Sequence, residues 1–186
     1  MAITLWSGPH SIVAVLATVA MVASRRGMVR LWPATPSIRT LVATCCEQFR
    51  RDVRTNSRRS QWLGALVWGG LLVVNHVFWL ATESYTKFQW LDLVAHAMGG
   101  AGVGALLFLG LRERVPNRVI TVWLSLLTLA VGAGFELYEF VFRSFWHHWS
   151  LQYYVTDTVV DLALDGAGAA VVVAALKRAE QATTVS

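Results

Sequence analysis

The chain has 186 residues, of which 55% are hydrophobic and only 15% are charged. Soluble domains carry about 25% charged residues, and here the apolar residues form long runs that leave no room for a separate soluble domain. The net charge of +5 would suit a nucleic-acid-binding protein, but the basic residues flank the apolar runs, so we expect membrane lipids and no nucleic acid as partners.

Five runs of mainly apolar residues are long enough to cross a bilayer as helices, which takes about 20 residues each. They cover residues 3–24, 62–82, 90–111, 119–142 and 155–176. We therefore predict an all-α polytopic membrane helix bundle of about five transmembrane helices, forming a single membrane domain over residues 1–186. In the first run the arginines follow the apolar stretch, which is typical of an uncleaved anchor rather than a cleaved signal peptide.

Residues 37–56 form an amphipathic stretch between the first two runs. Its apolar residues recur at helical spacing, and they are Ile38, Leu41, Val42, Cys45, Phe49 and Val53. The pattern predicts an interfacial helix on the inner membrane surface, held by anionic lipids; a helix that binds a protein partner is the alternative. We expect the neighbouring Cys45 and Cys46 to be reduced thiols, with a reversible lipid anchor as the alternative.

The basic residues are divided unevenly between the two sides of the predicted membrane. Fourteen of the 16 Lys and Arg residues lie in residues 25–60, 112–118 and 177–178. The connections on the opposite side hold only Lys87 and Arg143. Because Lys and Arg concentrate on the cytoplasmic side, this predicts a multi-pass protein of the cell (inner) membrane with its N-terminus outside and its C-terminus in the cytoplasm.

Small residues are concentrated in the last three predicted spans. They include Gly99, Gly100, Gly102, Gly104, Gly132, Gly134, Gly166 and Gly168. Small side chains let helices approach closely in lipid, so we expect these three spans to form the tight core. The spacing of Gly100 and Gly104 also fits a homodimer face, which is the alternative interpretation of that pair.

Six of the eleven acidic residues lie inside the predicted spans. They are Asp92, Glu136, Glu139, Asp157, Asp161 and Asp165. His76 and His96 lie in the same spans, which contain no Lys or Arg that could pair with the carboxylates. A charged side chain at the bilayer centre costs about 2.5–3.5 kcal/mol on insertion scales. The carboxylates therefore have to face one another, a cation or water, or be protonated.

Topology and spacing predict that these polar groups meet. The predicted helix directions place them in the outer half of the bilayer, and residues three or four apart share a helix face. We expect Asp161, Glu136 and His96 to converge. Carboxylates with imidazole suit a divalent cation such as Mg, Mn, Ca, Zn or Fe, so all six carboxylates and His96 are candidate metal ligands. His76 is a further candidate, with helix packing as its alternative role. A proton-sharing acidic cluster without metal remains open.

Motifs within residues 90–170 resemble those of the VanZ-like membrane proteins, and more closely those of the YjdF-like inner-membrane proteins. They read Asp92-x3-His96-x3-Gly100, Glu136-x2-Glu139 and Asp157-x3-Asp161-x3-Asp165. Compared with the VanZ-like pattern, Glu139 stands where Gln is usual and Asp165 where Asn is usual, so this version is more acidic. The resemblance implies a compact helical fold without a settled reaction.

Three classes of function fit the predicted pocket formed by these carboxylates and His96. The first is a metal-binding membrane protein that acts on a lipid or other amphiphile at the outer leaflet. The metal would polarise a phosphoryl or acyl oxygen or activate water, with Glu136 or Glu139 as general base; such an enzyme would be a metal-dependent hydrolase or transferase. The second is ion or proton transport, although the inner halves of the spans lack matching polar groups. The third is a non-catalytic assembly subunit of a membrane complex.

Overall fold

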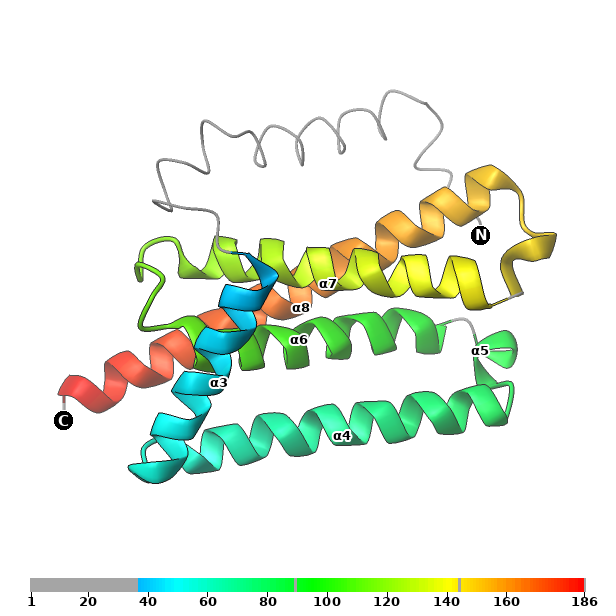
Figure 1. Ribbon diagram of the computed structural model, residues 1–186. Helices are drawn as coiled ribbons and strands as arrows, with labels where there is room; N and C mark the ends of the chain where they lie inside the picture. The colour runs from blue at the N-terminus through cyan, green and yellow to red at the C-terminus, as the bar shows by residue number, and fades with distance from the viewer. Residues whose placement is uncertain (1–36, 89, 144, 186) are drawn as a thin grey trace. The chain divides into compact units, whose positions relative to one another are not determined.

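The computed structural model describes residues 37–185 apart from positions 89 and 144 (Figure 1). Every secondary-structure element in this part of the chain is a helix, which confirms the all-α fold class. The contacts divide the chain into Met1–Arg39 and Thr40–Ser186, and the account below concerns the second unit together with the start of its first helix. The predicted span 3–24 lies outside the described residues.

Four of the described helices are long and apolar enough to cross a membrane. They are α4 (Arg59–Ala81), α6 (Trp90–Leu111), α7 (Ile120–Phe142) and α8 (Leu151–Val185). The remaining elements are α3 (Ile38–Arg54), α5 (Ser84–Lys87) and the short 3-10 helix η1 (Phe145–His148). The helix found for each of the last four predicted runs therefore begins and ends close to the predicted residues, except in α8.

Helix α8 is longer at both ends than the predicted span 155–176. At its start the Ser150 hydroxyl accepts a hydrogen bond from the backbone amide of Tyr153 at 3.2 Å, which is the contact made by a helix N-cap. At its end the helix continues past the apolar run through residues 177–182, which contain neither Gly nor Pro. Lys, Arg, Ala, Glu and Gln are good helix formers, so the helix continues although the predicted apolar run ends at residue 176.

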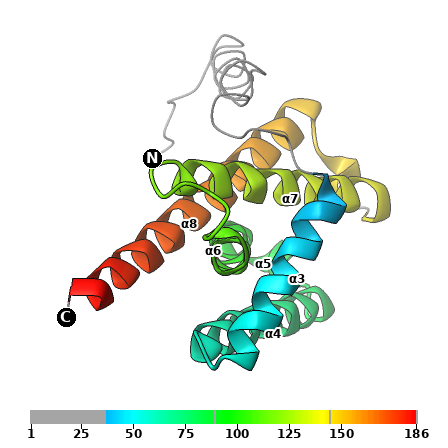
Figure 2. The same cartoon turned by 60° about the vertical axis from the view of Figure 1, so that its left-hand side comes forward.

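Helix α6 lies at the centre of the bundle and packs against α4, α7 and α8, most extensively against α8 (Figures 1 and 2). Glycines permit this approach, because a Cβ atom on Gly104 would lie 2.8 Å from the Cα of Ala169, and one on Gly168 would collide with the carbonyl oxygen of Ala97. Gly100 also meets α8, at the backbone of Asp165. The Gly100 and Gly104 pair is thus used for packing within the chain.

Helix α3 is held against the bundle by polar contacts as well as apolar ones. Phe49 meets the ring of Trp62 edge-on, with 5.2 Å between ring centroids. The buried Asp52 accepts hydrogen bonds from Gln48 at 3.1 Å, from Trp62 Nε1 at 2.8 Å, and from Arg112 at the end of α6. We predicted a helix held on the surface by anionic lipids, and the structure adds a buried protein network that the amphipathic pattern did not indicate.

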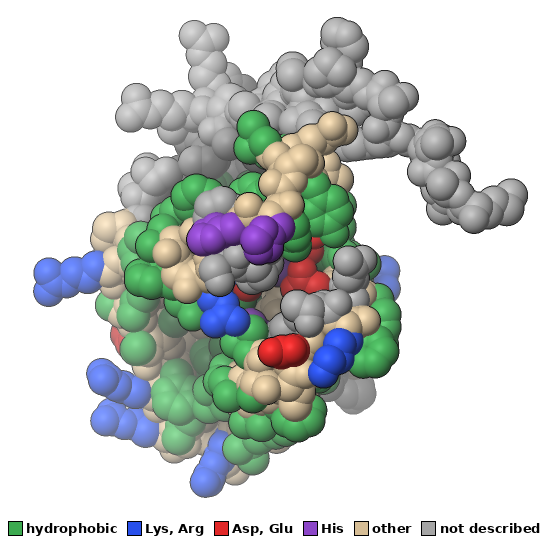
Figure 3. Space-filling view, turned by 90° about the vertical axis from the view of Figure 1, so that its right-hand side faces the viewer, with side chains coloured by type: hydrophobic (Ala, Val, Ile, Leu, Met, Phe, Trp, Pro, Cys, Tyr) green, Lys and Arg blue, Asp and Glu red, His purple; other side chains and the backbone are tan. Residues whose placement is uncertain are grey.

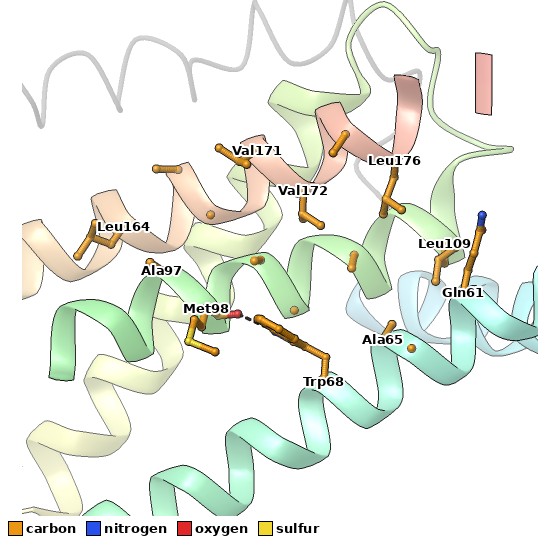
Figure 4. A pocket seen from close by; sticks show the side chains of 17 residues that line it. Gln61, Ala65, Trp68, Ala97, Met98, Leu109, Leu164, Val171, Val172 and Leu176 are labelled. Atoms are coloured by element: carbon orange, nitrogen blue, oxygen red, sulfur yellow. Dashed lines mark hydrogen bonds between the residues drawn. The ribbon is translucent and has the colours of Figure 1, made fainter. Parts of the chain in front are cut away.

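Two grooves flank the contact between α4 and α6. The α8-side groove lies between α4, α6 and α8 and has a volume of about 720 Å³ (Figure 4). Its walls are small and apolar side chains such as Ala101 and Val172, and Trp68 crosses it to donate a hydrogen bond to the carbonyl oxygen of Met98 at 3.2 Å. The α7-side groove, between α4, α6 and α7, has a volume of about 400 Å³ and includes polar residues.

Candidate metal centre

Polar side chains from three helices meet near the end of the bundle that carries α5 and η1, and acidic side chains are visible in a recess of this end (Figure 3). His96 comes from α6, Glu136 from α7, and Asp161 and Asp165 from α8. All four residues are buried, and Asp161 is only 2% exposed. Asp92, one turn before His96, is half-buried. Charged groups this far from water require compensation inside the protein.

The imidazole of His96 is the centre of this cluster. Its Nε2 atom lies 3.7 Å from Glu136 Oε1 and 3.9 Å from both Asp92 Oδ1 and Asp161 Oδ2. Its Nδ1 atom lies 3.4 Å from Asp165 Oδ1. One imidazole therefore faces four carboxyl groups, while it can carry a single positive charge at most.

Two glycines make room for Asp165 between α6 and α7. A Cβ atom on Gly100 would collide with the backbone of Asp165, and a Cβ atom on Gly132 would collide with its Oδ2 atom. A larger residue at Gly100 would push α8 away from His96, and one at Gly132 would displace the Asp165 carboxylate. The small residues that favour close helix packing thus also determine how closely the carboxylates approach the imidazole.

Several carboxylate oxygens in this cluster have no hydrogen-bond donor. Glu136 Oε2 accepts a hydrogen bond from the Thr158 hydroxyl at 3.0 Å. In contrast, Glu136 Oε1, Asp161 Oδ1 and Asp165 Oδ2 are buried without any hydrogen-bond partner. Buried polar atoms are nearly always hydrogen-bonded, so three such atoms around one histidine require an explanation.

Part of the cluster has the spacing of a metal site. One ligand atom from each of Asp92, His96 and Asp161 can be chosen so that all three lie within 4.8 Å of one another. Divalent ions bind oxygen and nitrogen at about 2.0–2.6 Å, so atoms on opposite sides of an ion are separated by about twice that distance. The three side chains could therefore hold one ion, and the donor set of carboxylates and imidazole suits a hard or borderline cation.

The other predicted site residues are placed differently. Glu139 and Asp157 are half-buried, and neither is among the four carboxyl groups within 4.0 Å of His96. His76, on α4, packs edge-on against the ring of Phe135 with 5.7 Å between centroids. The predicted convergence of Asp161, Glu136 and His96 is present in the structure, with Asp92 and Asp165 added.

Two residues of the site were not predicted. Phe135 contacts both histidines, since its ring also lies 5.9 Å from that of His96. Thr158 binds Glu136, and its position three residues before Asp161 places it on the acidic face of α8, a signal that was available in the sequence. No sequence signal identified Phe135, because an aromatic residue in an apolar run is ordinary.

These helices and the buried cluster define an integral membrane protein with a candidate metal centre between its spans. Residues 9–182 match the family described as predicted membrane protein (DUF2238), and the chain belongs to this family. No curated protein matches the chain, and no solved structure does.

Proposed function

We propose that the cluster binds a divalent cation, with Asp92, His96 and Asp161 as its first ligands and Glu136 and Asp165 completing the site. The observation that carries this proposal is the set of three buried carboxylate oxygens without hydrogen-bond partners. A cation on the Nε2 side of His96, where Asp92, Glu136 and Asp161 lie, would satisfy lone pairs of Glu136 and Asp161 and offset charge that the single imidazole cannot balance. Asp165 lies against the opposite nitrogen, Nδ1, and would hold the ring in place for the cation. Glu139 and Asp157 then lie nearer the entrance and add negative charge to it.

We further propose that the acidic end of the bundle faces the outside of the cell membrane, with the C-terminus in the cytoplasm. The basic connection 112–118 follows the opposite end of α6, where Lys177 of α8 donates a hydrogen bond to the carbonyl oxygen of Asn117. Most basic residues outside the spans thus belong to one side, which the positive-inside tendency assigns to the cytoplasm. The N-terminus would then lie outside.

The chemistry that suits this site is metal-assisted reaction of an amphiphile. A bound cation would polarise a phosphoryl or acyl oxygen, or lower the pKa of a bound water. Glu139 is close to the cluster without contacting His96, so it is the better candidate for a general base. The reaction would make the protein a metal-dependent hydrolase or transferase, a more specific role than the VanZ-like or YjdF-like resemblance supplies.

Ion or proton transport is the alternative, and the packing below the cluster argues against it. The fully buried side chains between the cluster and the cytoplasmic end include Phe108, Leu109, Leu124 and Val173. An intramembrane pathway needs polar groups or water along its length. The third class of function is a non-catalytic assembly subunit whose acidic cluster has only a structural role. The measurement of metal content and stability described next tests this class together with the cation proposal.

Metal content and stability, measured together in the purified full chain, test the proposal. Wild type should contain about one divalent ion per chain, and added cation should raise its thermal midpoint, because a ligand that binds only the folded state stabilises it. Asp161→Ala should lose both the ion and this response. Asp157→Ala is the matched control one turn earlier on α8, and it should retain both. A metal-free wild type with a stable Asp161→Ala variant would rule out the cation.

A further inference from the structure

The α7-side groove leads directly from the candidate metal centre into the apolar part of the bundle. Its ionisable lining residues lie at one end, and they include Asp92, His96 and Asp165. Further along, its walls are apolar, with Val103 and Leu106 on α6 among them, except for Thr128, whose hydroxyl donates a hydrogen bond to the carbonyl oxygen of Leu124 in its own helix. The volume of about 400 Å³ falls within the range of small-molecule sites, roughly 300–1,000 Å³. The groove is thus polar at one end and apolar along the rest of its length.

The length of this groove is comparable to the depth of one leaflet of a bilayer. His96 and Leu106 are ten residues apart on α6, which corresponds to about 15 Å along the helix axis. The hydrocarbon core of a bilayer is about 30 Å thick. The groove therefore covers about the depth of one leaflet, starting at the cluster.

The groove is also open to lipid along its side. Among its lining residues, Val73 of α4 is 65% exposed and Val131 of α7 is 52% exposed. Gly69 and Gly99 line the same groove, and a Cβ atom added to either would meet nothing within 4 Å. Space next to the helices is therefore available to a chain that enters from the bilayer.

A buried acceptor faces this space without a partner. Asp165 lines the groove and is 6% exposed, yet its Oδ2 atom has no hydrogen bond. The α8-side groove differs, since its lining side chains are apolar apart from Gln61 and the indole of Trp68. Of these two grooves, the α7-side groove is the one that combines an apolar channel with a charged end.

We infer that the α7-side groove binds one acyl chain of a phosphate-headgroup lipid, which presents its headgroup to the cation at the acidic cluster. This rests on the proposed function, because the carboxylates would repel a phosphate unless a cation lay between them. Divalent cations held by a few carboxylates commonly complete their coordination with substrate phosphates. The apolar channel holds the chain, and the cluster determines the depth of the headgroup.

Filling the groove with a side chain tests this inference. Gly99→Leu and Gly69→Leu would extend into it from Cβ positions that meet nothing within 4 Å. Gly134→Leu and Gly70→Leu are matched controls, since a Cβ atom there also meets nothing within 4 Å and neither position lines the groove. All four changes replace a helical glycine by leucine, so their effects on helix propensity are similar.

The probe is phosphatidic acid with a diazirine in one acyl chain, added to the full chain in phosphatidylcholine vesicles containing Mn²⁺. Irradiation followed by peptide mass spectrometry should place adducts on Val73, Val103 and Val131 in preference to Val122 and Leu137, which are exposed and line neither groove. Gly99→Leu and Gly69→Leu should reduce labelling of the groove to the level of those outward residues, with metal content unchanged. The control variants should label like wild type.

The possible outcomes separate this inference from the cation proposal. Equal labelling of groove and outward residues, or labelling that Gly99→Leu leaves unchanged, would overturn the acyl-chain site whether or not the protein binds metal. If labelling is blocked by Gly99→Leu in a protein that holds no cation, the acyl-chain site stands and the cation proposal fails. Loss of groove labelling by the phosphatidic acid probe on chelation, with labelling by a diacylglycerol probe that lacks a phosphate unaffected, would support the placement of the phosphate at the cation.

Discussion

The Asp52 carboxylate on α3 accepts two hydrogen bonds from Nη2 of Arg112 at the end of α6, at 3.2 and 3.0 Å. Both side chains are almost completely buried, at 4% and 5% exposure. Arg112 also lies 3.6 Å from Glu180 on α8. One ion-pair network therefore links the amphipathic helix to two of the membrane-spanning helices.

Breaking this network should be strongly destabilising. Arg112→Met is expected to lower the free energy of unfolding by about 3–5 kcal/mol, because it leaves the Asp52 carboxylate buried without a positive charge beside it. Reversible unfolding in mixed micelles measures the change. Arg51→Met is the control, since its ion pair with Glu113 is exposed and such pairs contribute about 0–1 kcal/mol. Equal losses in the two variants would mean that the buried pair has no special role.

The glycines around Asp165 give a second prediction. Gly132→Ala should destabilise the protein by about 1–3 kcal/mol, the usual cost of overpacking, because its methyl group would collide with the Asp165 carboxylate. Gly134→Ala, two residues away on α7, meets nothing within 4 Å and should be neutral or slightly stabilising through helix propensity. Thermal unfolding of both variants in the same detergent is the measurement. A harmless Gly132→Ala would show that the Asp165 carboxylate can turn away from α7 at no cost.

The two cysteines should differ in reactivity. Cys45 is half-buried against Gly110, whereas Cys46 is exposed. Burial, and secondarily the neighbouring Cys46, raise the pKa of the Cys45 thiol above its ordinary value. A raised pKa means less thiolate at neutral pH, so maleimide should label Cys46 faster at pH 7. The Cys45 rate should continue to rise as the pH passes about 8.5, the ordinary pKa of the thiol.

Single-cysteine variants provide that measurement. Cys46→Ser reports Cys45 alone, and Cys45→Ser reports Cys46 alone, each over a range of pH in the full chain. Denatured samples give the intrinsic rates. Identical pH profiles for the two folded variants would contradict the burial of Cys45, which lies on α3, against Gly110 of α6.

The orientation in the membrane gives a fourth prediction. In a background that lacks both native cysteines, an impermeant maleimide added to intact cells should label His148→Cys and leave Ser57→Cys unlabelled. Both positions are exposed, so access to the reagent depends on the side of the membrane. Permeabilised cells are the control, in which both variants should react. Labelling of Ser57→Cys alone from outside would reverse the proposed topology and move the acidic cluster to the cytoplasmic leaflet.

The sequence by itself determined the helices and the faces that carry charge. Runs of about 20 apolar residues can satisfy their backbone in lipid only as helices, so the spans 90–111 and 119–142 were predictable almost to the residue. The spacing of Asp157, Asp161 and Asp165 placed them on one face of α8. These spans contain six carboxylates and no Lys or Arg that could pair with them. This composition alone indicated that the carboxylates share a site.

Only the tertiary structure decided which of these carboxylates approach His96. Helical spacing gives the face of each residue and leaves the rotation and separation of neighbouring helices open. Those were decided by contacts distant in sequence, such as Gly132 against Asp165 and Phe135 against both histidines. The pairing of Asp52 with Arg112, 60 residues apart, could not be predicted for the same reason. Interactions between helices depend on which side chains packing brings together, and the local periodicity of the sequence does not determine this.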